Sequence, residues 1–457
     1  MREIITCQFG QCGNQLGQAF WRQIVTEHGL LPTDSSSTFF DETTQQSRAR
    51  AILVDMEPGV LNVIRASETA PLFTDQQFMS GDDGSGNNFG EGYFRHGGEQ
   101  TEKFVQIMQN QLEKCDSPQA VQTFQSLGGG TGSGLGSRLI EEIRDRFKFS
   151  IISACVIPSR DTSDVITSPY NSVCSMASLL ESSDVVLPFD NDRMFQAAQV
   201  QTIKPKSLAE LKPSNMSMYD ILLKQFKGEQ PQNSKNAQKK PFTEANKLVA
   251  LSMSSLSASM RFGGEINIDL NDIATNLIPF KDLNICLVNY SPLSEAQNLT
   301  GKLKQLFSIN NNLSTTQTDQ LTLANIIFSR SKDVDLGLMS QTFDSLAKND
   351  KFIKEQQFKI GITTGGVENL TDFCWLRNGE TCASTLDYIF KNYSQLKSKR
   401  MYLHHYLKFM EESELDRRSD VINKVLQGYK GMQQRINGDE VIEEEQQLKE
   451  SVKAALV

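Results

Sequence analysis

The sequence predicts an α/β fold in which a mostly parallel sheet carries helices on both faces. Short apolar segments that read as buried strands alternate with amphipathic helical segments from Ile4 to Asn191. This alternation is typical of a parallel sheet. Glycine-bearing turns also lie between strands and helices in this half of the chain. Because the carboxyl ends of parallel strands meet at one edge of a sheet, we expect a ligand site along that edge.

Length and composition limit the class of protein. The chain has 457 residues, too many for one hydrophobic core, so about two or three domains are expected. Its hydrophobic fraction of 38% and charged fraction of 22% are those of an ordinary globular protein. The formal charge of −9 argues against general nucleic-acid binding, which needs a basic surface, but it is compatible with basic partners.

The sequence shows no membrane or export segment. The longest apolar stretch, residues 149–157, has about half the length of a membrane span, and the first residues lack a signal-peptide core. The 8 cysteines form no CxxC pair and, with 4 histidines, offer no zinc site. We therefore expect a cytoplasmic protein with reduced thiols and no membrane association.

The first element is expected to be a strand, Ile4–Phe9, that enters a glycine-bearing turn, Gly10–Gly17, before a helix that reaches Val25. Nucleotide-binding α/β domains begin in this way. The turn carries side chains that can reach a phosphate or a sugar, namely Gln11, Cys12, Asn14 and Gln15. An ordinary strand-to-helix turn explains the same pattern about equally well.

A second strand, Ala51–Val54, leads into two carboxylates, Asp55 and Glu57. Mg²⁺ usually takes one or two protein carboxylates and keeps several waters, so this pair suits a magnesium ion. A capping Asp beside a solvated Glu is the simpler alternative for the pair alone. A glycine-rich stretch at 81–88 then offers backbone N–H groups and the amide of Asn87, or else it is a linker.

The segment richest in glycine is Leu127–Gly136, between a predicted strand at 121–126 and a predicted helix at 137–146. Glycine permits φ > 0 and a close approach of the backbone, so successive N–H groups can point at an anion beside a helix start. No lysine completes a Walker loop here, and the G-x-G-x-x-G spacing of dinucleotide sites is absent. We expect a phosphate held by backbone amides together with Thr131 and Ser133.

Strands predicted at 150–158 and 185–189 and a helix at 172–180 complete the first domain, residues 1–195. Residues 196–240 then interrupt the pattern. Between Lys204 and Lys240 the chain carries 8 lysines, which indicates a basic insertion on an acidic protein. This insertion is either a tolerated surface loop or an element that binds a partner.

Apolar residues recur at three- and four-residue steps from Phe242, which predicts a buried helix over 241–262 that joins two domains. Phe242 and Asn246, one turn apart, could meet a base by stacking and hydrogen bonding. A second α/β domain is expected over 263–380, with strands at 285–288, 323–328 and 358–362. Residues 381–457 are expected to form helices at 385–397, 399–409 and 414–435 and an acidic tail at 439–445.

Five motifs occur in order along the chain: Gly10-Gln-Cys-Gly-Asn-Gln15, Asp55-Met-Glu-Pro-Gly59, Gly84-Ser-Gly-Asn-Asn88, Gly128-Gly-Gly-Thr-Gly-Ser-Gly134 and Asn267-Ile-Asp-Leu270. Together they resemble the tubulin family over Met1 to Lys430. The resemblance implies a Rossmann-like, parallel-sheet GTP-binding domain, a second α/β domain joined by a central helix, and a C-terminal helical segment. It also implies GTP or GDP with Mg²⁺ as ligands and other tubulin-family subunits as head-to-tail partners.

The resemblance further implies a role for each matching residue. Phosphate and ribose would be flanked by Gln11, Cys12 and Gln15. The phosphates would be held by Ser126, Gly130, Thr131 and Gly132, with Asn87 near the γ-phosphate. Glu57, helped by Asp55, would reach Mg²⁺. Guanine would be read by Asn191 and Asn246 and stacked on Phe242, where tubulins often carry Tyr.

In this family, hydrolysis is completed between subunits, because an acid of one subunit activates water at the nucleotide of the next. The matching position is Asp272, with Asp269 beside it, and Asp272 is one methylene shorter than the Glu of alpha-tubulin. A carboxylate near bound phosphates can orient or deprotonate water. One departure concerns the sugar, since the usual glutamate before Pro-Tyr-Asn is Ser168 here, which removes a hydrogen-bond acceptor.

Shorter stretches are similar to the epsilon type within this family: Asp164-Val-Ile-Thr-Ser-Pro-Tyr-Asn171, Lys239-Lys-Pro-Phe242, Asn267-Ile-Asp-Leu-Asn-Asp272 and Leu403-His-His-Tyr-Leu407. That likeness implies a cytoskeletal subunit of centrioles or basal bodies, with their proteins as partners. The alternative is a non-polymerising GTP-binding regulator or a capping subunit of microtubule ends, which the insertion and Ser168 favour. An NAD-dependent oxidoreductase is disfavoured by the failed dinucleotide spacing.

Overall fold

The computed structural model describes residues 2–28, 37–41, 47–159, 165–200, 241–291, 299–308, 311–315, 322–331, 336–347, 358–363 and 372–432. The predicted basic insertion lies outside these residues from 201 onward, and the predicted acidic tail lies outside them entirely. The elements that position the candidate site all fall within the described part of the chain.

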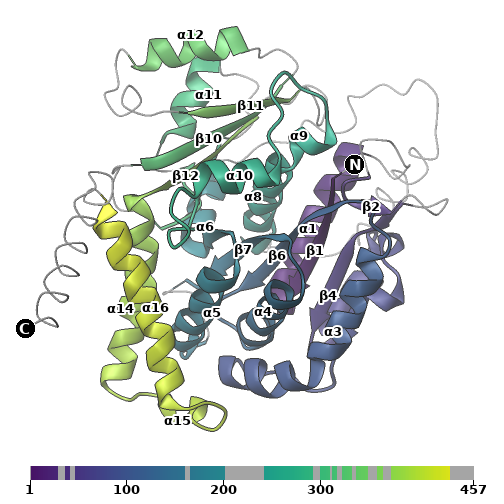
Figure 1. The fold of residues 1–457 in the computed structure, drawn as a ribbon, viewed down its shortest axis with the longest axis vertical. Coiled ribbons are helices and arrows are strands. Elements are labelled where there is room, and N and C mark those ends of the chain that lie inside the picture. Colours follow the sequence, from purple (N-terminus) through teal and green to yellow (C-terminus); the bar gives the residue numbers. More distant parts are fainter. Residues whose placement is uncertain are drawn as a thin grey trace, which may run out of the picture.

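A six-stranded parallel sheet confirms the fold class predicted for the first half of the chain (Figure 1). Its strands are β1 (Glu3–Phe9), β4 (Ala51–Asp55), β5 (Phe78–Ser80), β6 (Pro118–Ser126), β7 (Ser150–Ile157) and β8 (Val185–Asp190). They are arranged in the order β5-β4-β1-β6-β7-β8, and all neighbours are parallel. The chain therefore reverses its progress across the sheet between β1 and β6, where ligands of open parallel sheets bind.

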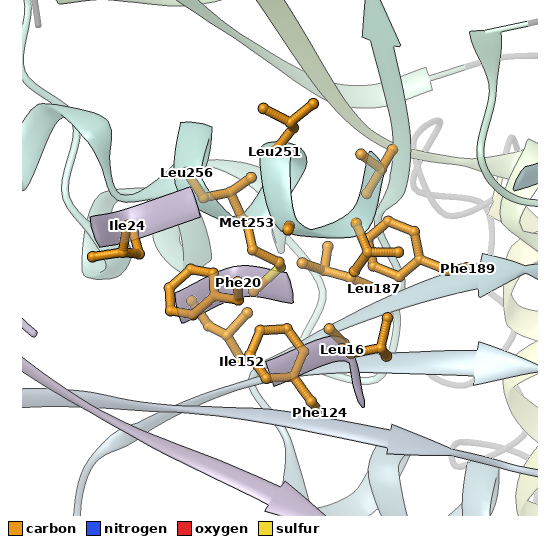
Figure 2. Packing of buried hydrophobic residues seen from close by; sticks show 14 of the residues in the cluster. Leu16, Phe20, Ile24, Phe124, Ile152, Leu187, Phe189, Leu251, Met253 and Leu256 are labelled. Atoms are coloured by element: carbon orange, nitrogen blue, oxygen red, sulfur yellow. The ribbon is translucent and has the colours of Figure 1, made fainter. Parts of the chain in front are cut away.

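Helices cover both faces of this sheet, and β1 and β4 are accordingly buried along their whole length. One face packs on α1 (Gly10–His28), α2 (Pro58–Arg65), α6 (Asn191–Val200) and α8 (Pro241–Leu256). The other face packs on α3 (Gly97–Leu112), α4 (Gly136–Arg146) and α5 (Ser168–Ser182). Figure 2 shows Phe20 of α1 and Met253 of α8 meeting above Phe124 of β6, so the central helix is anchored to the first sheet.

A four-stranded sheet forms the second unit, in the order β11-β10-β12-β9. Its strands are β9 (Leu287–Ser291), β10 (Thr322–Arg330), β11 (Lys359–Thr363) and β12 (Asp372–Gly379). One face packs on α11 (Leu299–Leu306) and α12 (Leu336–Ala347), and the other on α8 and α10 (Leu270–Leu277). The sequence predicts only three strands here, whereas β12 is a fourth and pairs antiparallel with both β9 and β10.

Three helices follow the second sheet: α14 (Ala383–Ser398), α15 (Leu403–Tyr406) and α16 (Glu412–Lys430). The single helix predicted over 399–409 is wrong. Arg400 and Tyr402 take left-handed backbone angles, with φ of +49° and +60°, and a left-handed residue cannot continue an α-helix. The chain instead turns sharply into the short α15, at the lower end of the molecule in Figure 1.

Several predicted loops are in fact the first turns of helices. Helix α1 begins at Gly10 and α5 at Ser168, so the glycine-bearing turn and the Pro-Tyr-Asn motif are helical. The predicted central helix is two helices, α8 and α9 (Ala258–Arg261). The described part of the chain also contains a two-stranded sheet of β2 (Phe40–Asp41) and β3 (Arg48–Ala49).

A buried charge network joins the two sheets. Glu27 of α1 contacts Arg261 of α9 at 2.6 Å and Arg330 of β10 at 2.7 Å, and all three side chains are almost fully buried. Arg330 also bonds Asp372 of β12, with Nε 2.8 Å from Oδ1. Burial alone would raise the pKa of Glu27, but the two guanidinium groups outweigh it and hold this pKa well below its usual range. Two acids and two bases thus balance inside the fold.

Two further features bear on the sequence predictions. All 8 cysteines are free. Among the helices of the described residues, none combines the length and the apolar character needed to cross a bilayer.

Candidate functional site

The glycine-rich loops that follow β1 and β6 touch each other. Gly10 has φ of +71°, a conformation that suits glycine best. A β-carbon built on Gly10 would lie only 2.7 Å from the backbone nitrogen of Gly132. These two glycines therefore bring the start of α1 against the loop after β6, at the switch point of the sheet.

The third glycine-rich stretch closes on the same loop. A β-carbon on Gly130 would lie 2.6 Å from the carbonyl oxygen of Ser85 and 2.8 Å from the backbone nitrogen of Asn88. The hydroxyl groups of Ser85 and Thr131 are 3.1 Å apart and share a hydrogen bond. Asn87 has φ of +52° and an exposed side chain. Three segments that are distant in sequence thus surround one loop.

The loop itself presents unpaired backbone donors. In the part of the chain that the structure describes, no acceptor bonds the amide N–H groups of Gly129, Gly130, Thr131 and Gly132. They lie just before and within a π-helical turn, Thr131–Leu135, that leads into α4. Clustered N–H groups at a helix start form an anion site. The backbone cradle predicted from the glycines therefore has the donors that a phosphate needs.

One prediction about this loop is wrong. The Ser133 side chain is buried, and its hydroxyl donates its hydrogen to the carbonyl oxygen of Gly129. That hydrogen is therefore used within the loop and cannot hold a phosphate. Ser126 is half-buried, and its hydroxyl accepts from the N–H of Gly128 at 3.2 Å. Its hydrogen can be directed either to the Cys12 sulfur or to a ligand.

Asn171 ties these loops together, although the sequence analysis gives it no role. Its Nδ2 donates to the carbonyl oxygens of Asn87 at 2.8 Å and Gly128 at 2.7 Å, and its Oδ1 accepts from the N–H of Phe89 at 2.9 Å. The side chain is fully buried. A fully satisfied buried amide fixes backbone geometry strongly. Its only sequence signal is an Asn in the polar run after β7.

The first turn of α1 divides the predicted polar residues into two groups. Gln11 and Gln15 are exposed one turn apart, on a common face of the helix. Asn14 is buried, and its Nδ2 donates to the carbonyl oxygens of Gly10 and Val54, both at 2.9 Å, whereas its Oδ1 has no hydrogen-bond partner among the described residues. Cys12 is half-buried. Burial raises the pKa of its thiol to about 12, partly opposed by the Ser126 hydroxyl, so the thiol is neutral at physiological pH.

The two carboxylates differ in environment. Asp55 ends β4 and is only 3% exposed, whereas Glu57 is exposed at the N-cap of α2. Burial raises the pKa of Asp55 to about 6, and the N–H of Glu57, 3.3 Å from Oδ1, opposes the rise. A β-carbon on Gly84 would collide with the Glu57 carboxylate. Glu57 therefore lies against the third glycine-rich stretch, beside the cradle.

The residues predicted to read a base lie on α6 and α8. Asn191 begins α6 at the carboxyl end of β8, and Asn246 lies on α8, which packs against α6. Both are half-exposed. Phe242 is 47% exposed, and its ring meets Phe195 of α6 edge to face at 5.1 Å. The ring is thus held from one side and offers an open face to a base.

Asp269 and Asp272 are not brought to the glycine loops. Asp269 caps α10 by accepting from the N–H of Asp272 at 2.7 Å, and its carboxylate pairs with Arg2. Arg2 precedes β1, whereas Gly10 follows it, so the acids and the cradle lie at opposite ends of a 7-residue strand. At about 3.3 Å per residue that strand spans roughly 23 Å. Figure 1 shows the N-terminus in the upper part of the molecule, as α9 and α10 are, and α15 at the lower end.

A parallel sheet with a backbone phosphate cradle at its switch point defines a nucleotide-binding α/β protein. Residues 3–199 match the model of the Tubulin/FtsZ family, GTPase domain. The tubulin beta-6 chain of Gallus gallus is 34% identical over 307 residues, which cover 64% of this chain and 61% of the relative. The tubulin beta-1 chain of Homo sapiens is 32% identical over 365 residues, 74% of each chain. The tubulin beta chain of Porphyra purpurea is 33% identical over 331 residues, 68% of this chain and 65% of the relative.

The chain belongs to the tubulin family. The match of its first half to a GTPase domain implies a guanine nucleotide as the ligand of that domain. The chain spans less than two thirds of the Gallus gallus and Porphyra purpurea relatives.

Proposed function

We propose that this chain is a GTP-binding subunit that joins other tubulin-family subunits head to tail and hydrolyses GTP at the contact. The triphosphate is held by the N–H groups of Gly130, Thr131 and Gly132, with the hydroxyl of Ser126. The remaining nucleotide contacts come from Gln11, Cys12, Gln15, Asn87, Asn191, Phe242 and Asn246. The unpaired amides of the cradle support this assignment because they need an acceptor that no described residue provides.

The residues beside the cradle also suit a magnesium ion. Asp55 and Glu57 supply two carboxylates next to the cradle, which is the number that Mg²⁺ usually takes from a protein when phosphate oxygens and waters complete its shell. Once bound, the ion neutralises charge on the phosphates. Asp55 would act from its buried position as an acceptor for the ion or its water, and Glu57 from the rim.

The observation that carries the proposal is the placement of Asp272 at the opposite end of the sheet from the cradle. Within one chain the carboxylate cannot reach the nucleotide, but it faces the next subunit in a head-to-tail row. Heterologous contacts of this kind propagate as filaments. In the site that two subunits form together, a water attacks the γ-phosphorus and its proton passes to the Asp272 carboxylate. The bond from the γ-phosphorus to the bridging oxygen breaks, and GDP leaves with that oxygen on its β-phosphate. Asp269 holds the turn that presents Asp272.

A complementation experiment tests this arrangement. Asp272→Ala keeps the cradle but lacks the acid, and Gly130→Val keeps the acid but has its cradle blocked by Ser85. Each variant alone should be inactive in assembly-linked phosphate release. An equal mixture should regain about a quarter of the parent rate, because about a quarter of random head-to-tail contacts pair the intact cradle of one variant with the intact acid of the other.

A mixture as inactive as its components, although both variants co-sediment with the parent chain in the absence of other tubulins, would contradict catalysis between subunits. Nucleotide bound to the purified parent should be identified as GTP or GDP in the same series. A parent chain that binds guanine nucleotide yet never co-sediments with tubulin-family subunits would favour the second candidate, a non-polymerising regulator or capping subunit of microtubule ends.

We further propose a specialised subunit of the epsilon type that acts in centrioles or basal bodies, and not a subunit of the bulk lattice. The short motifs shared with that type support this, whereas Ser168 favours the non-polymerising alternative. Ser168 is buried, and its β-carbon would lie 3.6 Å from one built on Gly128, so a short hydroxyl stands beside the cradle where a carboxylate is usual. Phe242 offers no hydroxyl. A tagged chain should label basal bodies in ciliated cells; uniform labelling of cytoplasmic microtubules would overturn this assignment.

A further inference from the structure

The carboxylate proposed to activate water is held at both of its oxygens. Asp272 Oδ2 accepts from the N–H of Asp269 at 3.2 Å, which closes a capping box at the start of α10. Asp272 Oδ1 lies 3.7 Å from Nζ of Lys359. The Asp272 side chain is 44% exposed, so this pair is open to a docking neighbour.

Lys359 is placed by the second sheet and not by α10. It begins β11, where it is in register with Ile326 of β10. Helix α10 packs against β10. The sheet therefore fixes the backbone of the lysine, while its ammonium group reaches Asp272 on α10. The pair joins two elements that the sequence separates widely.

Charge explains why such a partner is useful. Asp269 and Asp272 would meet a neighbour's triphosphate, and two bare carboxylates facing a polyanion repel it. In this chain each acid has a basic partner, Arg2 for Asp269 and Lys359 for Asp272. Each of the two acids on this surface is thereby offset by a base.

We propose that Lys359 is a positioning residue for hydrolysis, which orients the Asp272 carboxylate and offsets its charge against the neighbour's phosphates. This inference rests on the proposed function in trans. Lys359 itself takes no proton and contacts no nucleotide within its own chain. It acts through Asp272, so its effect requires that carboxylate.

The test measures phosphate release per assembled subunit for Lys359→Met, Lys359→Gln and Lys359→Arg. Lys359→Met and Lys359→Gln should lower the rate about tenfold, part of the 10²–10⁴ that a general base contributes, and Lys359→Arg should restore most of it. Bound nucleotide should be unchanged, because the cradle lies at the other end of the sheet. Lys424→Met, at an exposed position of α16, is the matched control and should behave as the parent.

A double variant separates this role from a structural one. Lys359→Met combined with Asp272→Asn should be no slower than Asp272→Asn alone, because the lysine has nothing left to position. Lys359→Met at the parent rate, or a double variant slowed by the product of both effects, would overturn the inference alone. Asp272→Asn at the parent rate would instead remove the proposed function itself, and the inference with it.

Discussion

The phenolic hydroxyl of Tyr406 donates a hydrogen bond to Oδ1 of Asn171 at 2.6 Å, across 235 residues of sequence. Both side chains are fully buried. Asn171 holds the backbone of Asn87 and Gly128, so α15 is connected through one amide to two loops of the candidate nucleotide site. Burial also raises the pKa of Tyr406, which keeps the hydroxyl a donor.

This connection predicts graded effects on nucleotide binding. Asn171→Ala should release the bound nucleotide and destabilise the chain by about 1–3 kcal/mol, since it leaves buried donors and acceptors of two loops and of α15 unpaired. Tyr406→Phe removes one of these bonds and should retain most of the nucleotide. Nucleotide content after gel filtration, with denaturant unfolding in parallel, measures both effects. Equal nucleotide loss in the two variants would contradict the central role of Asn171.

The contact of Gly10 with Gly132 predicts that a single methyl group disrupts the cradle. Gly10→Ala places a β-carbon at positive φ and within 2.7 Å of a backbone nitrogen, so the two loops must separate. GTP affinity should fall at least about tenfold, which corresponds to losing the binding free energy of about one hydrogen bond. Gly98→Ala on α3 is the control, because nothing lies within 4 Å of its added carbon. It should bind normally and melt slightly higher, as Ala favours helix.

The raised pKa of Asp55 predicts how pH acts on magnesium binding. Its carboxyl is protonated in the folded chain below about pH 6, compared with an ordinary value of 3.8. A proton therefore competes with Mg²⁺ below pH 6, and the Mg²⁺ concentration needed to retain nucleotide should rise about tenfold per pH unit. Titrations at pH 7.5, 6 and 5 measure this. Asp55→Asn should need more Mg²⁺ at every pH and lose the dependence.

The same pKa sets the sign of a stability effect. Ionising a buried carboxyl costs free energy in the folded state only, so the Mg²⁺-free chain should lose stability as pH rises from about 4 to above 6. Asp55→Asn should remove that part of the loss. Identical pH profiles of melting for parent and variant, both without Mg²⁺, would count against the buried environment of Asp55.

The buried network between the sheets predicts a large single effect and a smaller double one. Arg330→Met leaves Asp372 without its ion-pair partner inside the fold and should cost about 3–5 kcal/mol of unfolding free energy. Adding Asp372→Asn removes the unpaired charge, while Glu27 keeps Arg261, so the double variant should be more stable than Arg330→Met. Urea unfolding of parent, single and double variants measures this. A double variant weaker than the single would refute the charge argument.

The sequence predicted the sheet well because its signals are local. A strand such as β6 is an apolar run bounded by turn residues, and the glycines after it allow only a few backbone shapes. Helix starts were predicted less well. Gly10 and Ser168 read as loop residues, yet both begin helices, since packing against the sheet outweighs weak local propensity. Strand β12 is not predicted, because its Asp, Arg and Asn residues interrupt the apolar run, although every residue of the strand is buried between β9 and β10.

Candidate site residues were predicted one by one, but their availability was not. Ser133 and Asn14 have the right chemistry, but the Ser133 hydroxyl and the Asn14 Nδ2 group donate hydrogen bonds within the fold. Asn171 stands in the Pro-Tyr-Asn motif and Lys359 at the start of a predicted strand, but the role of each depends on a partner far away in sequence. Asp269 and Asp272 were expected together and are together, in one capping box.

The sequence by itself determined the α/β class, the glycine loops and the kind of ligand they suit, because backbone freedom and hydrophobic period are properties of short segments. Only the tertiary structure decided which polar groups face a ligand, and that Asp272 lies at the far end of the sheet from the cradle. Those outcomes depend on strand order and on contacts between separate segments of the chain. No short stretch of sequence encodes them.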